Sequence, residues 1–190
     1  MTPRSWGKPT LDGGLFVKAY QHTGDSRYRD VAINLANTLL ADEDPPGNWL
    51  CYGPARKETG AIHPRHAYWY GYPMVHVYDM TQERKYLEAA VRSGDWYMKA
   101  MRRDGGMFRG TYVDGSTDSF GHAASGVGSA VIMWIDLCNR LEDERYVPYI
   151  RKGLRFLLSM QVRKAEDPNM QGTIIEKIMP PDGTDASPYL

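Results

Sequence analysis

Apolar and polar residues alternate along this chain in a helical pattern that recurs about every 59 residues. Tyr28, Tyr86 and Tyr146 each head a helix-like stretch, and they lie 58 and 60 residues apart. Apolar positions that keep their register through repeats of this length indicate tandem α-hairpins, each of which buries an apolar stripe against the next. Four aligned columns are apolar in all three copies: Phe16, Met74 and Trp134; Ala19, Val77 and Leu137; Ala32, Ala90 and Ile150; Leu39, Tyr97 and Leu157.

Turn signals divide each repeat into two helices. They predict hairpins at about residues 15–41, 69–102 and 127–162, followed by an irregular tail at 163–190, with Asp25 as the N-cap of the first return helix. The expected fold is therefore all-α, a single domain or fragment made of tandem α-hairpins of an α/α toroid. Six such hairpins need roughly 350 residues on this period, so the chain accounts for only about half of a full toroid. An uncapped repeat array exposes an apolar face, and we expect a second copy or a missing remainder of the same chain to cover it.

Composition excludes several classes of partner. The chain has 190 residues, of which 42% are hydrophobic, and 23 Lys plus Arg balance 23 Asp plus Glu without a run of like charge. The length and the hydrophobic content are enough to bury a core. The balanced charge provides no basic patch that would bind nucleic acid or an anionic membrane. Because the sequence has neither a membrane-length apolar stretch nor a secretory signal pattern near Met1, we expect a soluble chain, cytoplasmic or periplasmic. Two cysteines do not form a disulfide framework, and no cofactor motif is present.

The densest group of chemically capable side chains, at residues 63–72, leads into the second hairpin. Arginine offers a planar fork for a carboxylate, and aromatic faces offer the flat apolar surface on which a sugar ring stacks. The alternative is that the rings are core residues at a helix start and the histidines form local hydrogen bonds. We predict a substrate-binding set from this segment: Arg65, His66, Tyr68, Trp69, Tyr70 and Tyr72.

The spacing of Arg65 and Trp69 resembles the Arg-Gly-x-Gly-Trp element that precedes a hairpin in unsaturated glucuronyl hydrolases and their rhamnogalacturonyl relatives, which belong to the six-hairpin glycosidases. The likeness continues through residues 81–90 and 104–108 and covers about half of the chain. His66 and Tyr68 stand where that element has glycines. The resemblance implies that Arg65 and Trp69 contact a uronic sugar.

A second candidate segment, residues 114–126, enters the third hairpin and resembles the Asp-Ser-Ser-Ala segment of the same hydrolases. Asp118 stands about five residues farther from the following helix than in that pattern. Either Asp114 or Asp118 could act as a general acid or base, with His122 as a partner that titrates near neutrality. The alternative is that these residues cap a helix and form turns.

Three further observations complete the candidate chemistry. Asp12 and Glu176 are weaker carboxylate candidates near hairpin ends. The histidines lack a His-Glu-x-x-His signature, so no metal site is expected.

We therefore predict a carbohydrate-active enzyme, a glycoside hydrolase that acts on uronate-containing oligosaccharides. A polysaccharide lyase, a sugar epimerase on the same toroid, and a noncatalytic repeat module that binds a glycan or a protein are the alternatives. Two titratable groups that converge on one pocket would favour an enzyme over the binding module.

Overall fold

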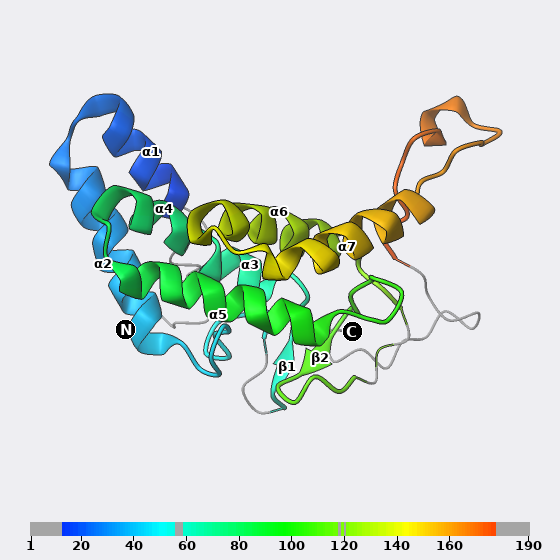
Figure 1. The fold of residues 1–190 in the computed structure, drawn as a ribbon, viewed down its shortest axis with the longest axis horizontal. Helices are drawn as coiled ribbons and strands as arrows, with labels where there is room; N and C mark the ends of the chain where they lie inside the picture. Colours follow the sequence, from blue (N-terminus) through cyan, green and yellow to red (C-terminus); the bar gives the residue numbers. More distant parts are fainter. Residues whose placement is uncertain (1–12, 56–58, 118, 120, 178–190) are drawn as a thin grey trace. The chain divides into compact units, whose positions relative to one another are not determined.

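The computed structural model describes residues 13–55, 59–117, 119 and 121–177. The first hairpin consists of α1 (Gly13–Thr23) and α2 (Ser26–Asp42), which lie side by side in Figure 1. Asp25 is the N-cap of α2, because its carboxylate accepts a 2.9 Å hydrogen bond from the backbone N–H of Arg27. The capping residue predicted from the sequence is confirmed.

The second hairpin begins with two helices instead of the single helix expected from about Trp69 onward. These are α3 (His66–Gly71) and α4 (Pro73–Thr81), and α5 (Arg84–Ala100) is the return helix. The break falls at Pro73 because proline has no N–H to donate and starts a new helix at its first position. The turn between α4 and α5 uses Gln82 in the left-handed conformation, with φ of 61°.

The third hairpin consists of α6 (Ala124–Leu141), a short 3-10 turn (Glu144–Tyr146) and α7 (Val147–Ser159). α7 ends three residues before the predicted boundary at 162, and the following segment folds back through hydrogen bonds such as that from Ile175 N–H to the carbonyl of Met160 (3.0 Å). Two short strands, β1 (Ala61–Ile62) and β2 (Thr111–Tyr112), and a 3-10 turn (Pro168–Met170) complete the elements.

Glycine is required where the loop after α5 approaches α7. Gly105 has φ of +95°, and a Cβ at this position would lie 2.5 Å from the carbonyl oxygen of Lys152. No other residue combines that backbone conformation with that approach. The Asp-Gly-Gly sequence at 104–106 thus serves packing against α7.

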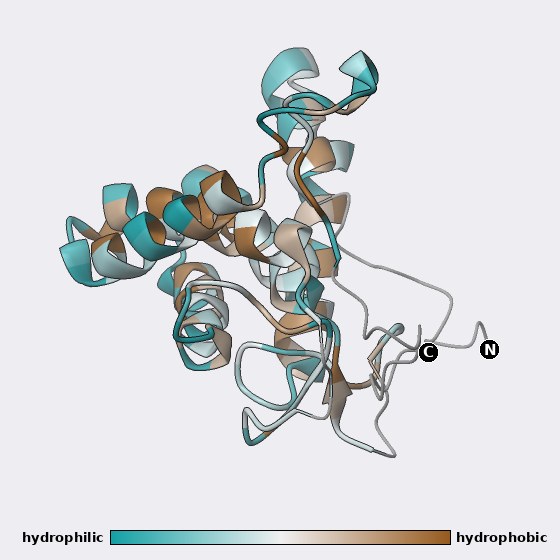
Figure 2. Cartoon of the chain, turned by 90° about the vertical axis from the view of Figure 1, so that its right-hand side faces the viewer, coloured by the Kyte–Doolittle hydropathy of each residue, from teal (hydrophilic) through white to brown (hydrophobic). Residues whose placement is uncertain are grey.

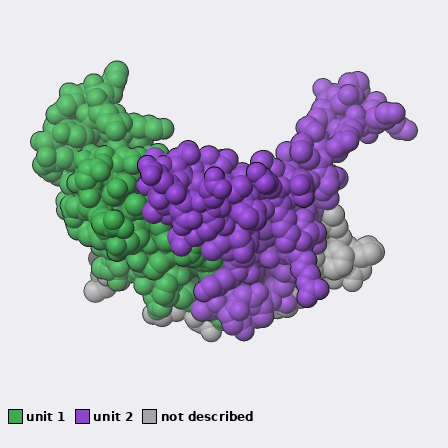
Figure 3. Space-filling model, viewed as in Figure 1, with its two compact units in different colours: residues 1–62, 66–97 green, residues 63–65, 98–190 purple. Residues whose placement is uncertain are grey.

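The chain forms two compact units, residues 1–62 with 66–97 and residues 63–65 with 98–190 (Figure 3). Helices of the chain have an apolar and a polar side (Figure 2). Most residues of the four repeat columns are buried in these cores: Ala32, Leu39, Met74, Val77, Ala90 and Tyr97 in the first unit, and Trp134 and Leu137 in the second. Within the described part of the chain, no helix is both long and apolar enough to span a lipid bilayer.

Candidate functional site

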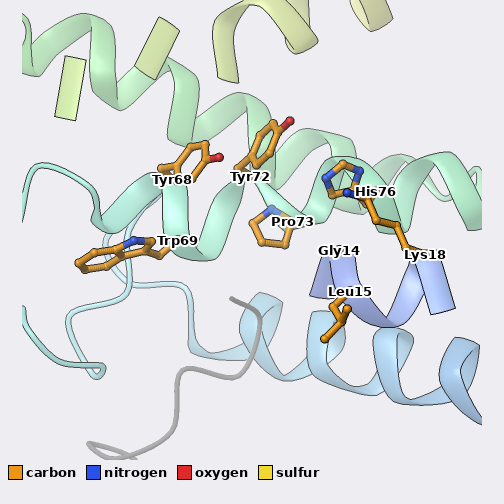
Figure 4. Close-up of a pocket in the computed structure, with 8 residues that line it drawn as sticks. All are labelled: Gly14, Leu15, Lys18, Tyr68, Trp69, Tyr72, Pro73 and His76. Carbon is orange, nitrogen blue, oxygen red and sulfur yellow. The ribbon is translucent and has the colours of Figure 1, made fainter. Parts of the chain in front are cut away.

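The first unit contains a pocket of about 210 Å³ between the start of α1 and the α3–α4 segment (Figure 4). This volume is below the range of drug-sized ligand sites and suits one ring of a sugar. Its lining combines aromatic faces with basic side chains: Gly14, Leu15, Lys18, Tyr68, Trp69, Tyr72, Pro73 and His76. Three of the six predicted binding residues, Tyr68, Trp69 and Tyr72, therefore meet at one site.

The aromatic wall follows from helical spacing. Tyr68, Tyr72 and His76 are four residues apart, which places them on one face of the α3–α4 segment. The rings of Tyr68 and Tyr72 stack with centroids 4.8 Å apart and planes 10° apart, and Tyr72 meets the edge of His76 at 5.3 Å. The hydroxyl of Tyr97 on α5 accepts a 3.2 Å hydrogen bond from the backbone N–H of Tyr68 and anchors the start of this wall.

A glycine brings α1 against the opposite side of the pocket. A Cβ at Gly14 would lie 2.8 Å from Cδ2 of His76, so any larger residue there would displace the imidazole. Lys18 follows one helical turn later, and Figure 4 shows its side chain extending toward His76. Among the described residues, no carboxylate forms an ion pair with Lys18. The pocket thus has a basic end.

The sequence prediction did not include Lys18 and His76 in the binding set. A local signal existed, since His76 continues the four-residue series of Tyr68 and Tyr72. Lys18 had no comparable signal, because its place depends on how α1 packs on α4.

His66 and Tyr70, also predicted to bind substrate, are fully buried in the core of the first unit. His66 Nε2 lies 2.8 Å from the carbonyl oxygen of Trp49, and the Tyr70 hydroxyl donates a 3.1 Å hydrogen bond to the carbonyl of Gly53. Burial raises the pKa of Tyr70 far above its ordinary value, with a smaller contribution from Cys51. Both side chains hold the loop before α3 in place, and neither lines the pocket.

Arg65 lies at the start of the second unit. It is half-buried, and its backbone N–H donates a 3.2 Å hydrogen bond to Nδ1 of His63. Its role in substrate binding stays a prediction.

Asp114 and His122, two of the predicted catalytic residues, both form contacts within the second unit. The carboxylate of Asp114 accepts hydrogen bonds from the N–H (2.9 Å) and hydroxyl (2.6 Å) of Ser116, and these bonds lower its pKa. His122 is only 2% exposed, with Nε2 3.2 Å from the carbonyl oxygen of Ile175. Asp118 lies outside the described residues, as does Asp12.

Glu176 reaches the N-terminus of α6 from the tail. Its carboxylate accepts hydrogen bonds from the N–H (2.7 Å) and the hydroxyl (2.5 Å) of Ser125, and its carbonyl accepts one from the N–H of Ala124 (3.0 Å). A carboxylate stabilises the positive end of a helix dipole. The geometry supports a capping role for this residue.

No model of a known protein family matches the sequence, and comparison with curated proteins finds no match. Solved structures of three kinds of enzyme are similar. An unsaturated glucuronyl hydrolase specific for heparin has a TM-score of 0.65 and 15% identity, over 82% of this chain and 46% of that one. A cellobiose 2-epimerase from Spirochaeta thermophila has a TM-score of 0.65 and 14% identity, over 83% and 44%. A GH76 α-mannanase from Bacteroides thetaiotaomicron has a TM-score of 0.61 and 19% identity, over 80% and 44%.

These similarities establish the fold. The chain has tandem α-hairpins of the α/α-toroid type, as the sequence predicted. It spans about half the length of the solved structures that it matches.

Proposed function

We propose that this chain is part of a carbohydrate-active enzyme that hydrolyses uronate-containing oligosaccharides. The pocket in the first unit is the observation that carries the proposal, because its aromatic faces and basic groups match the two recognisable parts of a uronic sugar. The fold supports it. Similar structures include a glucuronyl hydrolase specific for heparin and another responsible for glycosaminoglycan degradation.

In this proposal the sugar ring stacks on the aromatic wall. Trp69 and the Tyr68–Tyr72 pair offer flat apolar surface with polar edges. Lys18 and His76 supply hydrogen-bond donors at the basic end, where the carboxylate of the uronate would lie. No aspartate or glutamate is among the described lining residues, so no like charge opposes that group. Arg65 is the further carboxylate ligand proposed from its sequence resemblance.

Hydrolysis also needs a carboxylic acid to protonate the glycan and activate water. We assign this role to Asp118. Asp114 suits it less well, because its hydrogen bonds from Ser116 lower its pKa and so disfavour the protonated form that a general acid needs. His122 could assist only after losing its contact with the Ile175 carbonyl, and the raised pKa of Tyr70 excludes that phenol as a base at neutral pH.

The test is an activity assay on unsaturated uronyl disaccharides. Hydrolysis removes the conjugated double bond, so we expect ultraviolet absorbance to fall when the chain is added. A control reaction with Tyr72→Ala should be slower, since that variant lacks one face of the aromatic wall. Unchanged absorbance with the wild-type chain, under conditions where circular dichroism shows it folded, would reject the hydrolase.

Sugar epimerisation is a second candidate, and His76 favours it. An imidazole beside a stacked ring can exchange a proton with a sugar carbon. In this case the chain would convert a neutral disaccharide such as cellobiose into its 2-epimer, detected by chromatography, and leave the absorbance of unsaturated disaccharides unchanged. Binding of a uronate oligosaccharide without either reaction would instead identify a noncatalytic module.

A further inference from the structure

Tyr97 has a hydroxyl at a repeat position that otherwise holds aliphatic side chains. It is the eleventh residue after its marker tyrosine, Tyr86, and its equivalents in the other hairpins are Leu39 and Leu157. Tyr97 and Leu39 are both fully buried, so packing at this position needs only an apolar side chain. A buried hydroxyl costs free energy unless it is hydrogen-bonded. The hydroxyl of Tyr97 therefore points to a role besides packing.

The hydroxyl oxygen of Tyr97 caps the short helix that begins the aromatic wall. It accepts a 3.2 Å hydrogen bond from the backbone N–H of Tyr68, in the first turn of α3. N–H groups in the first turn of a helix have no partner within the helix. A side-chain oxygen of the preceding residue often supplies one, but the residue before α3 is Arg65, whose guanidinium can only donate. An acceptor from α5 thus replaces the local cap.

The position of α3 depends on such contacts because the helix has only six residues. A helix of this length is not stable by itself in water. His66 and Tyr70 fix it to the backbone of the preceding loop, and Tyr97 holds it from α5. The carbonyl of Tyr68 in turn accepts a 3.2 Å hydrogen bond from the N–H of Tyr72. Both stacked rings, shown in Figure 4, are therefore attached to backbone that the Tyr97 hydroxyl helps to hold in place.

We infer that Tyr97 is a positioning residue of the sugar pocket, which it does not line. The inference rests on the proposed function, in which the aromatic wall stacks on the sugar. Through the N–H of Tyr68, the Tyr97 hydroxyl fixes the wall in the arrangement in which the Tyr68 and Tyr72 rings lie 10° from parallel. A preorganised wall loses less side-chain freedom when the sugar binds. Tyr97 therefore raises affinity for acidic and neutral sugars alike, whereas Lys18 acts on the acidic sugar alone.

The test replaces Tyr97 by phenylalanine, which keeps the ring and removes the hydroxyl. Tyr97→Phe should weaken binding of a uronate disaccharide and of its neutral counterpart by the same factor, about two- to tenfold, as expected for one hydrogen bond. Calorimetric titration measures both affinities. Tyr86→Phe is the matched control on the same helix, because the fully buried Tyr86 donates a 2.9 Å hydrogen bond to Oδ1 of Asn37 on α2, and neither residue lines the pocket. This control should lose stability without losing affinity.

A double-mutant cycle separates positioning from a general loss of stability. If Tyr97 acts through the wall, Tyr97→Phe should reduce affinity much less in a Tyr68→Ala background than in the wild type. Tyr86→Phe should leave affinity unchanged in both backgrounds, with circular dichroism verifying that each variant is folded. An undiminished effect of Tyr97→Phe in the Tyr68→Ala background, or unchanged affinity of Tyr97→Phe for both sugars, would overturn the inference.

Amide hydrogen exchange, followed by NMR without any sugar, tests the contact itself. The Tyr68 amide should exchange several-fold faster in Tyr97→Phe than in Tyr86→Phe, which controls for lost stability. Equal rates in the two variants would overturn the inference even if the chain binds sugar. Faster exchange in Tyr97→Phe, combined with a wild-type chain that binds neither sugar, would instead reject the proposed function, and with it the effect of Tyr97 on affinity.

Discussion

The segments that lead into the second and third hairpins contain similar kinds of polar and aromatic side chains, but the structure places these side chains differently. Between residues 66 and 76, aromatic and basic side chains converge on a pocket, with the Tyr68 and Tyr72 rings 4.8 Å apart. Between residues 114 and 125, Asp114, His122 and Ser125 instead form contacts inside their own unit, as His122 does with the Ile175 carbonyl. Residue type alone therefore does not distinguish a binding surface from a structural cap.

The difference lies in burial. A buried polar atom is stable only if the fold gives it a hydrogen-bond partner, and burial also keeps that atom away from a ligand. The same contrast exists within the first segment. Tyr70 donates to the Gly53 carbonyl from the core, whereas Tyr72, one position beyond Gly71, faces the pocket.

Substitution of Asp118 should have the largest effect. A loss of turnover would show that the segment before the third hairpin takes part in catalysis. Asp118→Asn removes the proposed proton donor, so turnover of an unsaturated disaccharide should fall by about 100-fold or more. Binding, measured by calorimetry, should persist. Asp114→Asn is the matched control and should retain turnover, because its exposed carboxylate holds a turn. The opposite pattern in these two variants would assign the acid to Asp114.

Removing one stacking face should have the next largest effect. Tyr72→Ala is expected to weaken binding of a uronate disaccharide about tenfold, because an aromatic contact contributes about 1 kcal/mol beyond its buried area. Calorimetric titration measures the change. Tyr78→Ala, within the α4 helix that Tyr72 precedes, does not alter the pocket lining and serves as the control. Equal affinities of the wild type and the two variants would show that the aromatic wall does not bind the sugar.

Tyr70→Phe tests whether the buried Tyr70 hydroxyl stabilises the fold without binding the sugar. Loss of the bond to the Gly53 carbonyl should lower the free energy of unfolding by about 1 kcal/mol, measured by denaturant titration. Sugar affinity should not change. A loss of affinity as large as that of Tyr72→Ala would mean that the buried phenol contributes to binding.

The smallest expected effect concerns the basic end of the pocket. Lys18→Gln should weaken uronate binding by about two- to fivefold, as expected for an exposed charge pair, and leave the neutral sugar unaffected. The effect should shrink with added salt. Lys99→Gln on α5 is the exposed control. If affinity for the neutral sugar fell equally, Lys18 would contribute packing instead of charge.

The repeat made most of the fold predictable. The apolar columns predicted three hairpins because burial enforces a helical period, and two of the three marker tyrosines are fully buried. Tyr28 differs, because its side chain is 36% exposed. The sequence contains a signal for the break at Pro73, since a proline lies inside a helical pattern. The apolar pattern continues through this proline, so it predicted one helix instead of two.

The site was predictable only in part. Tyr68, Trp69 and Tyr72 stood out because they are close in sequence. Lys18 depends on α1 packing against α4, which the close approach at Gly14 permits. The partner of His122 is 53 residues away. Such long-range contacts have no local pattern, so the prediction could not separate a side chain buried in the core from one that faces a pocket.

The most direct measurement is a pair of calorimetric titrations of the wild-type chain, with a glucuronate-containing disaccharide and with its neutral counterpart. We expect both sugars to bind, the acidic one more tightly. Tyr72→Ala should weaken the binding of both, and Lys18→Gln should weaken the binding of the acidic sugar alone. Absence of binding, or binding that neither variant changes, would show that this pocket is not a uronate site.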